Sequence, residues 1–438
     1  MISLLSLAAP TFPASARLIA YLCLLLFTPF VIAQNSTAAT DNNITVAHWW
    51  LSESELKSAT VLKKHLSQYN LDWKNISADD NSTTGYLGNI QSWLTQSQRP
   101  DAAIVIGSSA FAHNSAEHFL QLDQVAEEQS WEDVIPYAIQ ATSKHKGHWI
   151  SAPFNNHSTN WLWLNKTLFS QLDLPEPETW NDLIAVLDRA KQLGIPALVT
   201  LNSDWQQTQL FEMLLVATAR MESYRRIFID NTIIETEDKR QLLTTFLRLK
   251  QISRYFSDNT LKSTWNEASD LLGQGKVLMQ INGSWVNSEL KNLGWKADED
   301  YLCLRFPDTQ GAYIFNSDHF VFFKNGPAAA KNQRQMARAL LDKEFQRDLS
   351  MVSGAAPVRV DISTKGFDNC TKKNVHDLRM ANMRNAVIPM ISNPKLLKTV
   401  SDYLALKTTA EQASDLTLAL FTQITIDNKA NAGLSDAD

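Results

Sequence analysis

Residues 44–106 alternate between short strand-like runs and longer helical patterns, and this alternation constrains the fold more than any other feature of the sequence. Strands are indicated at Ile44-Thr45-Val46-Ala47, at Leu71–Ile76 and in the continuous apolar run Ala102–Ile106. A helix is predicted after the first strand, where Ser52 and Glu55 have the spacing of a capping box, and another around 87–94. A βαβαβ order of this kind predicts a parallel sheet with helices on its faces.

A second α/β pattern begins after Pro153. The length of 438 residues allows two or three domains, so this pattern can form a second α/β unit. Thr179 is the expected cap of a helix that opens at Pro177–Leu183. The sequence shows no internal repeat. The further elements expected in this half are strands over 161–164, 195–201 and 277–281 and helices over about 206–220, 236–255 and 264–273.

The N-terminus carries the one segment apolar enough to enter a membrane, Leu18–Ile32. Its 15 residues are fewer than the roughly 20 that a spanning helix needs. Because Arg17 precedes it and the small-residue site Val31-Ile32-Ala33 ends it, we expect a signal peptide over 1–33, cleaved before Gln34. Retention of the segment as a membrane anchor is the alternative. A polar tether over 34–43 follows.

Charge and cysteine content narrow the class of protein. The chain has 40 Lys and Arg against 46 Asp and Glu, so we expect no nucleic-acid partner. Of three cysteines, Cys23 lies in the export segment, leaving Cys303 and Cys370. An even pair in an exported chain favours a disulfide, which would close a loop of about 67 residues; two buried free thiols are the alternative.

Motifs that carry catalysis or bind cofactors are missing. The sequence contains no GxxxxGK, GxGxxG, HExxH, CxxC or GxSxG motif. Nothing therefore nominates a catalytic residue, a metal site or a cofactor.

Aromatic and polar clusters stand out instead. His48-Trp49-Trp50 follows the first strand, at the strand end where open α/β sheets bind ligands. Indole faces there could stack on the apolar face of a sugar, although neighbouring strand residues point opposite ways and one ring could be core. Two further clusters lie at 149–161 and at 275–285, the latter followed by Phe315-Asn316-Ser317-Asp318.

Together these segments resemble the extracellular solute-binding proteins of bacterial ABC sugar importers, and most closely the periplasmic glucose/mannose-binding branch. The resemblance rests on HWW at 48–50 with Glu55, and on several motifs in the same order over about 44–425. These motifs are WISAPFNNHSTNWLWLNK at 149–166, CLRFPDTQG at 303–311, FNSDHF at 315–320, the segment 353–361 and FDNC at 367–370.

The resemblance implies a periplasmic-binding-protein-like α/β fold with two lobes, a ligand cleft between them and several hinge crossings. Crossings are expected near 150–154, 312–315 and 352–357. Lobe one would comprise 44–150 with 316–352, and lobe two 151–312 with 358–438. Both Cys303 and Cys370, paired in that branch, would then lie in lobe two.

Ligand-binding residues follow from the same resemblance, each beside a structural alternative. Trp49 and Trp50 would stack on the sugar. Glu55 would accept hydrogen bonds from sugar hydroxyls or serve only as a helix cap. Asp318 would also accept hydrogen bonds from sugar hydroxyls, or would be a turn residue. Trp285 would form a second-lobe wall or core. The remaining candidates, which would line the cleft or be purely structural, are His157, Asn160, Trp205 and Gln206.

Four departures change the ligand that the resemblance implies. Ser353 stands where the branch has a cleft Lys, Ile104 where it has a polar Gln, and Ser284 where it has an Asp. The branch's late His has no match in 387–394. Each loss would leave a hydroxyl unpaired at a cost of roughly 1–3 kcal/mol, which favours a larger or less polar sugar than glucose, held more by aromatic walls.

We therefore expect a monomeric periplasmic protein that binds a carbohydrate by hinge closure and delivers it to an ABC membrane permease. The alternative is a ligand-sensing module of the same fold that partners a membrane receptor or kinase. A secreted enzyme on this scaffold is the third hypothesis.

Overall fold

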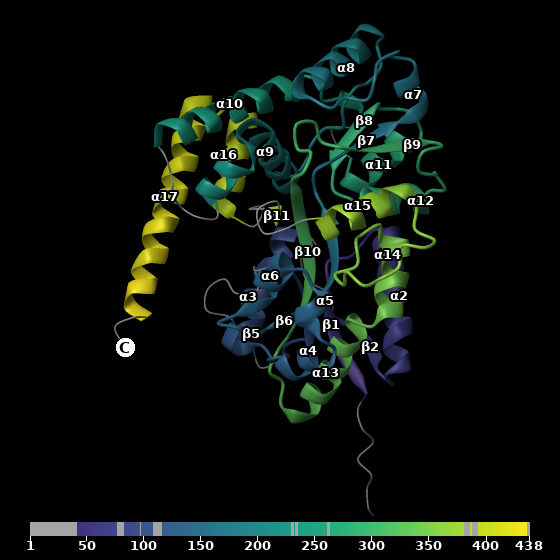
Figure 1. Cartoon of the computed structure of the whole chain (residues 1–438), viewed down its shortest axis with the longest axis vertical. Helices are drawn as coiled ribbons and strands as arrows, with labels where there is room; N and C mark the ends of the chain where they lie inside the picture. The colour runs from purple at the N-terminus through teal and green to yellow at the C-terminus, as the bar shows by residue number, and fades with distance from the viewer. Residues whose placement is uncertain are drawn as a thin grey trace, which may run out of the picture. The chain divides into compact units, whose positions relative to one another are not determined.

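The computed structural model describes residues 42–76, 83–96, 98–107, 116–228, 232, 235–260, 263–380, 386–387 and 393–435 (Figure 1). The predicted signal peptide and nearly all of the tether lie outside these residues, as does most of 387–394. No helix in the described ranges combines the length and hydropathy needed to cross a membrane.

A six-stranded sheet forms the centre of the first lobe. β1 (Asn43–Ala47) lies between β2 (Asp72–Ile76) and β3 (Ala102–Ile106), and all three are parallel, as predicted. The long β10 (Tyr313–Phe322) adds antiparallel to β3 and pairs on its other edge with β6 (Ser151–Ser158). The two-residue β11 (Ala386–Val387) pairs with the start of β10.

Side chains of this sheet alternate between two buried faces, which is why the central strand β3 is wholly apolar. Ile104 and Phe320 lie on one face, and Val105 and Val321 on the other. α2 (Glu53–Gln68), α13 (Pro327–Leu340) and α14 (Lys343–Ser353) cover the first face, and α3 (Thr83–Thr95) covers the second. Smaller elements complete the lobe: α4 (Asp123–Glu128), α5 (Trp131–Val134), α6 (Tyr137–Ser143), β4 (Lys144–His145) and β5 (His148–Trp149).

The second lobe is built on a three-stranded antiparallel sheet. Its central strand β7 (Trp161–Asn165) pairs with β8 (Met279–Asn282) and β9 (Tyr301–Arg305). α9, α10, α16 and α17 pack together on one side of it (Figure 1). The helices of this lobe are α7 (Lys166–Ser170), α8 (Trp180–Gln192), α9 (Asp204–Phe228), α10 (Glu235–Ser253), η3 (Asp258–Thr260), α11 (Trp265–Gly273), α12 (Val286–Asn292), α15 (Asn369–Met380), α16 (Pro394–Leu404) and α17 (Ala410–Ser435).

One strand prediction in this lobe is wrong. The segment 195–201 makes single bridges at Leu198 to Phe256 and Met279 but forms no ladder. Pro196 has no N–H to donate, so a regular ladder cannot run through this segment. Its carbonyl still accepts from the Leu278 N–H at 2.8 Å, which keeps the segment against β8.

Three adjacent segments join the lobes. β6 and β10 pair along their length, and Asn156 and Ala356 exchange backbone hydrogen bonds of 3.0 and 2.8 Å. β6 pairs with β10 from Ser151, opposite Val321, to Ser158, opposite Phe315, so the expected crossing at 150–154 lies within the ladder of the first sheet. Val358 also packs in the core of the first lobe, beyond the expected boundary.

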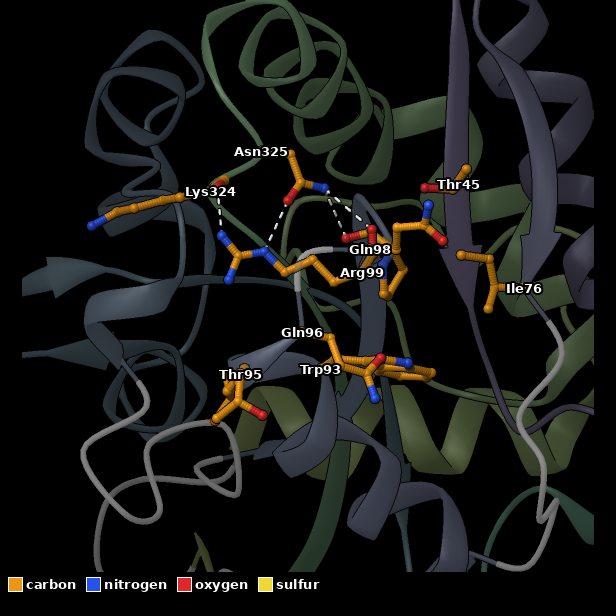
Figure 2. A pocket seen from close by; sticks show the side chains of 11 residues that line it. Thr45, Ile76, Trp93, Thr95, Gln96, Gln98, Arg99, Lys324 and Asn325 are labelled. Carbon is orange, nitrogen blue, oxygen red and sulfur yellow. Dashed lines mark hydrogen bonds between the residues drawn. The ribbon is translucent and has the colours of Figure 1, made fainter.

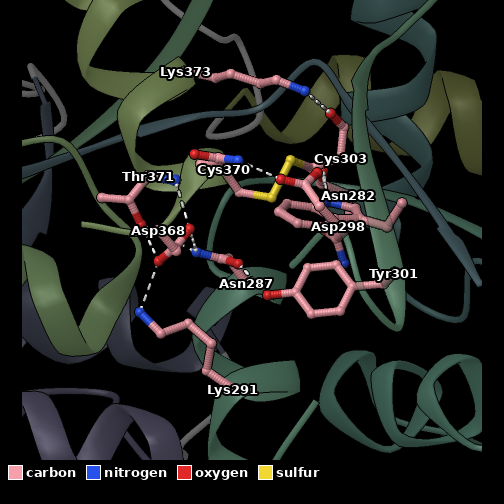
Figure 3. Close-up of a disulfide and its surroundings, with 12 residues drawn as sticks. Asn282, Asn287, Lys291, Asp298, Tyr301, Cys303, Asp368, Cys370, Thr371 and Lys373 are labelled. Carbon is pink, nitrogen blue, oxygen red and sulfur yellow. Dashed lines mark hydrogen bonds and ion pairs between the residues drawn. A yellow bond between two sulfur atoms is a disulfide. The ribbon is translucent and has the colours of Figure 1, made fainter. Parts of the chain in front are cut away.

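The disulfide between Cys303 and Cys370 is present and ties β9 to α15 within the core of the second lobe (Figure 3). Its surroundings are fully bonded: Lys373 Nζ donates to the Cys303 carbonyl at 3.0 Å, and Lys291 Nζ lies 2.8 Å from Asp368. α15 also reaches the first lobe, because its residues Val375 and Leu378 pack in that core.

Candidate functional site

A cavity of about 280 Å³ lies where the two lobes face each other. Its first-lobe wall contains a row of three residues on neighbouring strands: Ile106 on β3, Asp318 on β10 and Asn155 on β6. The row lies at the carboxyl end of β3, the edge of an open α/β sheet at which ligands bind.

Trp49 and Trp50 both line this cavity, immediately beyond β1. Trp50 is 6% exposed, packs edge-on against Phe154 and belongs to the core of the first lobe. Trp49 is more exposed and meets Tyr86 edge-on at 5.3 Å between ring centroids. The two rings therefore differ: Trp49 offers the freer surface, while Trp50 supports the lobe as well as the wall.

Three further indoles form the second-lobe wall: Trp205, Trp265 and Trp285. Trp285 lies between Trp205, 6.0 Å away between ring centroids, and His157, 5.5 Å away. Trp205 and Trp265 stand in the first turns of α9 and α11. Five of the thirteen tryptophans of the chain thus surround one cavity, with faces contributed by both lobes.

Glu55 serves as a helix cap and also lines the cavity. It completes the capping box of α2, accepting from the N–H groups of Leu51 at 3.0 Å and Ser52 at 2.8 Å. Both bonds end on Oε2, so Oε1 carries no cap bond. Burial raises the pKa of Glu55 and outweighs these hydrogen bonds, which act to lower it.

Asp318 is 6% exposed and accepts a hydrogen bond from Asn155 Nδ2 on Oδ2 at 3.0 Å. Burial, with a smaller contribution from the charge of Glu55, raises its pKa to about 7. His157 is also buried, and burial lowers its pKa to about 3, which keeps the ring neutral. Its Nδ1 bonds the Ser284 hydroxyl at 2.9 Å.

Two predicted residues lie outside the cavity lining. Asn160 is fully buried and donates to Thr309 at 3.0 Å and to the Ala312 carbonyl, so it anchors a crossing segment. Gln206 follows Trp205 in α9 and accepts from the Ser203 hydroxyl at 2.8 Å. Seven of the nine predicted residues are brought together.

Of the three residues that differ from the resembled branch, one lines the cavity and two do not. Ser353 lines the cavity, whereas Ile104 is buried in the first-lobe core and Ser284 bonds His157 behind the lining. Only Ser353 therefore changes the cavity surface directly.

Several lining residues were missed by the sequence analysis. Trp265 could have been found, because the capping box of Thr264 and Glu267 marks a helix start directly before it, as Asp204 does for Trp205. The others occupy helix turns or strand rows with no distinctive motif: Ser54, Ser58, Ile106, Asn155, Ser288, Asn316, Pro394 and Leu397.

The lobes also touch at the cavity rim. Ser54 on α2 donates to Glu289 Oε2 on α12 at 2.6 Å, and Lys57 hydrogen-bonds Asn292 beside it. Both pairs join helices of opposite lobes, so they hold the walls together on this side.

A wider groove of about 820 Å³ lies elsewhere on the first lobe (Figure 2). Its polar groups bond each other: Arg99 donates to Asn325 Oδ1 at 3.0 Å and to the Lys324 carbonyl at 2.7 Å (Figure 2). The groove contains one indole, Trp93, and no residue of the second lobe. The interlobe cavity is therefore the stronger candidate site. Within the described residues, no group of three or more His, Cys, Asp or Glu could hold a metal ion.

Comparison with known proteins gives a consistent result. Residues 58–343 match the family model described as bacterial extracellular solute-binding protein. The chain is 32% identical over 379 residues to a "Probable sugar-binding periplasmic protein" of Brucella suis, covering 84% of this chain and 88% of that protein. A protein of the same description from Rhizobium meliloti is 32% identical over 375 residues, covering 83% and 88%.

Solved structures show the same fold. A "Chitin oligosaccharide binding protein" superposes with a TM-score of 0.74 at 19% identity, over 87% of this chain and 98% of that one.

Proposed function

Because this chain belongs to the family of bacterial extracellular solute-binding proteins, we propose that it captures a sugar between its two lobes for an ABC-type importer. The curated relatives are described as sugar-binding and periplasmic, and they match this chain over more than four fifths of its length. A binding role also agrees with the lack of catalytic motifs in the sequence.

The interlobe cavity is the observation that carries this proposal. Indoles stand on both walls, Trp49 on one and Trp285 on the other, and between them lie the carboxylates of Glu55 and Asp318. A sugar ring presents apolar C–H faces to such indoles and hydroxyls to such acceptors. The second-lobe wall adds the indoles of Trp205, Trp265 and Trp285 to the indoles and carboxylates of the first-lobe wall, so a sugar gains contacts from both walls only in the closed arrangement.

Closure has a structural basis in the rim. The Ser54–Glu289 bond forms only when α2 and α12 meet. The hinge consists of two backbone-paired strands, β6 and β10, beside the segment at Ala356. A ligand that contacts both walls adds its contacts to this rim bond and shifts the population toward closure.

We further propose a ligand of one or two hexose units, of the kind bound by the glucose/mannose branch. The volume of about 280 Å³ lies at the small end of ligand sites, which argues against a ligand much larger than glucose, the size that the sequence departures favoured. The serine at 353 removes the positive charge that the branch places there, so the preferred hexose is expected to differ from plain glucose.

Export would follow from the N-terminal segment. We propose that residues 1–33 direct the chain to the periplasm and are removed there, and that the mature protein is a monomer. N-terminal sequencing of the secreted protein should begin at Gln34; a start within or before Leu18–Ile32 would indicate an anchored protein.

Calorimetric titration of the purified mature protein against a panel of neutral, amino and acidic monosaccharides and disaccharides tests the function. We expect saturable binding of at least one sugar, and a loss of that binding in Trp285→Ala. Trp295→Ala is the matched control, because this indole packs against Gly273 in the second lobe and does not line the cavity. Absence of binding across the panel, or equal effects of the two variants, would contradict the proposal.

A further inference from the structure

The interlobe cavity is lined by two acidic side chains whose pKa values are raised by burial, and its wall supplies no basic partner for them. Two carboxylates line it, Glu55 and Asp318, and none of the described lining residues is Lys or Arg. Lys57, on the same helix as Glu55, is engaged with Asn292 on the opposite lobe. The lining histidine, His157, is held neutral by burial, so it supplies no positive charge.

Each carboxylate keeps one oxygen for a ligand. Both cap bonds of Glu55 end on Oε2. Asp318 accepts from Asn155 on Oδ2 only, and its Oδ1 has no hydrogen-bond partner among the described residues, although the side chain is more than nine-tenths buried. Since Asp318 lines the cavity, its Oδ1 is an acceptor that a ligand in the cavity can reach.

Helix starts at the cavity offer few N–H groups to an anion. In the first turns of α2, α11 and α16, the capping side chains Ser52, Thr264 and Asn393 each accept from one or two N–H groups. α12 begins at the cavity without a side-chain cap, but the N–H groups of Val286 and Asn287 donate to backbone carbonyls.

The five indoles favour a cation in the same space. The face of an indole attracts a cation more strongly than that of any other aromatic side chain, and the attraction grows when water is excluded. A carboxylate–ammonium hydrogen bond is also stronger than the bond of a carboxylate to a neutral hydroxyl. The chemical features of the wall therefore converge on a ligand that carries positive charge.

We propose, on the basis of the sugar-binding function above, that the cavity selects an aminosugar: a hexose whose ammonium group bonds Asp318 Oδ1 and Glu55 Oε1 between the tryptophan faces. The hydroxyl of Ser58 and the amide of Asn316, both on the cavity wall, can hydrogen-bond the remaining hydroxyls of such a ring. A quaternary amine without hydroxyls would leave these groups unused.

The test compares four matched ligands by calorimetry at pH 7: glucosamine, glucose, N-acetylglucosamine and glucuronate. N-acetylation removes the charge of the amine while keeping the ring, and glucuronate reverses the charge. We expect glucosamine to bind at least tenfold more tightly than glucose or N-acetylglucosamine, and glucuronate not to bind. If glucose or N-acetylglucosamine binds as tightly as glucosamine, the aminosugar inference is wrong while the sugar-binding function stands. If none of the four ligands binds and no sugar of the wider panel does, both are wrong.

Variants locate the charge effect. Asp318→Asn and Glu55→Gln remove one charge each, and Gln can still accept the cap bonds; each should reduce the preference for glucosamine over glucose at least fivefold. Ser58→Ala is the matched control, because it removes a cavity hydroxyl without changing charge and should weaken both sugars by similar factors. An unchanged preference in both charge variants would overturn the assignment.

Discussion

Replacing Trp49 by alanine should separate the binding role of the Trp49-Trp50 pair from its structural role. Trp49 is partly exposed to the cavity, so a sugar that covers one face of the ring would remove about 100 Å² of it from water, out of the 150–250 Å² that an aromatic side chain can bury. At about 25 cal/mol per Å², this amounts to about 2.5 kcal/mol, or roughly a 70-fold increase in Kd.

Trp50→Ala should behave differently, because that ring is 6% exposed and packs on Phe154 in the first-lobe core. Truncating a buried tryptophan destabilises a protein by about 3–5 kcal/mol. We therefore expect a large fall in the free energy of unfolding for Trp50→Ala and a smaller one for Trp49→Ala, which loses its edge contact with Tyr86.

Calorimetric titration with the sugar that binds, together with urea unfolding of the ligand-free variants, measures both quantities. Trp295→Ala, outside the cavity, controls for the general effect of losing an indole. If Trp49→Ala binds as tightly as the parent while losing as much stability as Trp50→Ala, both rings are core and the first-lobe wall has been assigned incorrectly.

Three further perturbations follow from the structure. A β-carbon at Gly283 would collide with the indole of Trp285 on the second-lobe wall, so Gly283→Ala should weaken sugar binding at least tenfold. Gly273→Ala would collide with Trp295, which lies outside the cavity, and should leave the Kd within threefold. Equal Kd values for the two variants would refute this reasoning. Because burial raises the pKa of Asp318 to about 7, the ligand-free folded chain holds a proton that the unfolded chain has released, so the free energy of unfolding should fall as pH rises from about 4 to 7. Asp318→Asn should flatten that slope in urea titrations, and an unchanged slope would exclude this carboxyl as the cause. Replacing Cys303 and Cys370 together by serine opens a loop spanning 67 residues and should lower the free energy of unfolding by roughly 4 kcal/mol without changing sugar affinity; a large loss of affinity would mean that the bridge shapes the cavity.

The architecture was predictable where local pattern and burial agree. The apolar run Ala102–Ile106 requires a strand covered on both faces, and the capping box at Ser52 fixes the helix that follows β1. The segment 195–201 was mispredicted because its apolar content resembles a strand, while Pro196 removes a donor that a ladder needs.

The site was partly predictable for a different reason. Trp49, Glu55 and Trp285 belong to local motifs whose positions at strand and helix ends indicate ligand contact. Ser54 and Leu397 reach the cavity only because α2 and α16 are brought against it by the packing of the lobes, which no local pattern contains. Asn160 shows the reverse case. It lies within a family motif, but its side-chain amide donates to Thr309 and to the Ala312 carbonyl in a buried crossing segment instead of to a ligand.

The crystal structure of the protein grown with its tightest-binding sugar tests the central claim most directly. We expect one sugar ring between Trp49 and Trp285, in contact with both lobes and with Asp318 and Glu55, while the groove beside Arg99 remains without ligand. A sugar bound in that groove, or one touching a single lobe, would contradict the proposal that this protein captures its ligand by closing two tryptophan-lined walls around it.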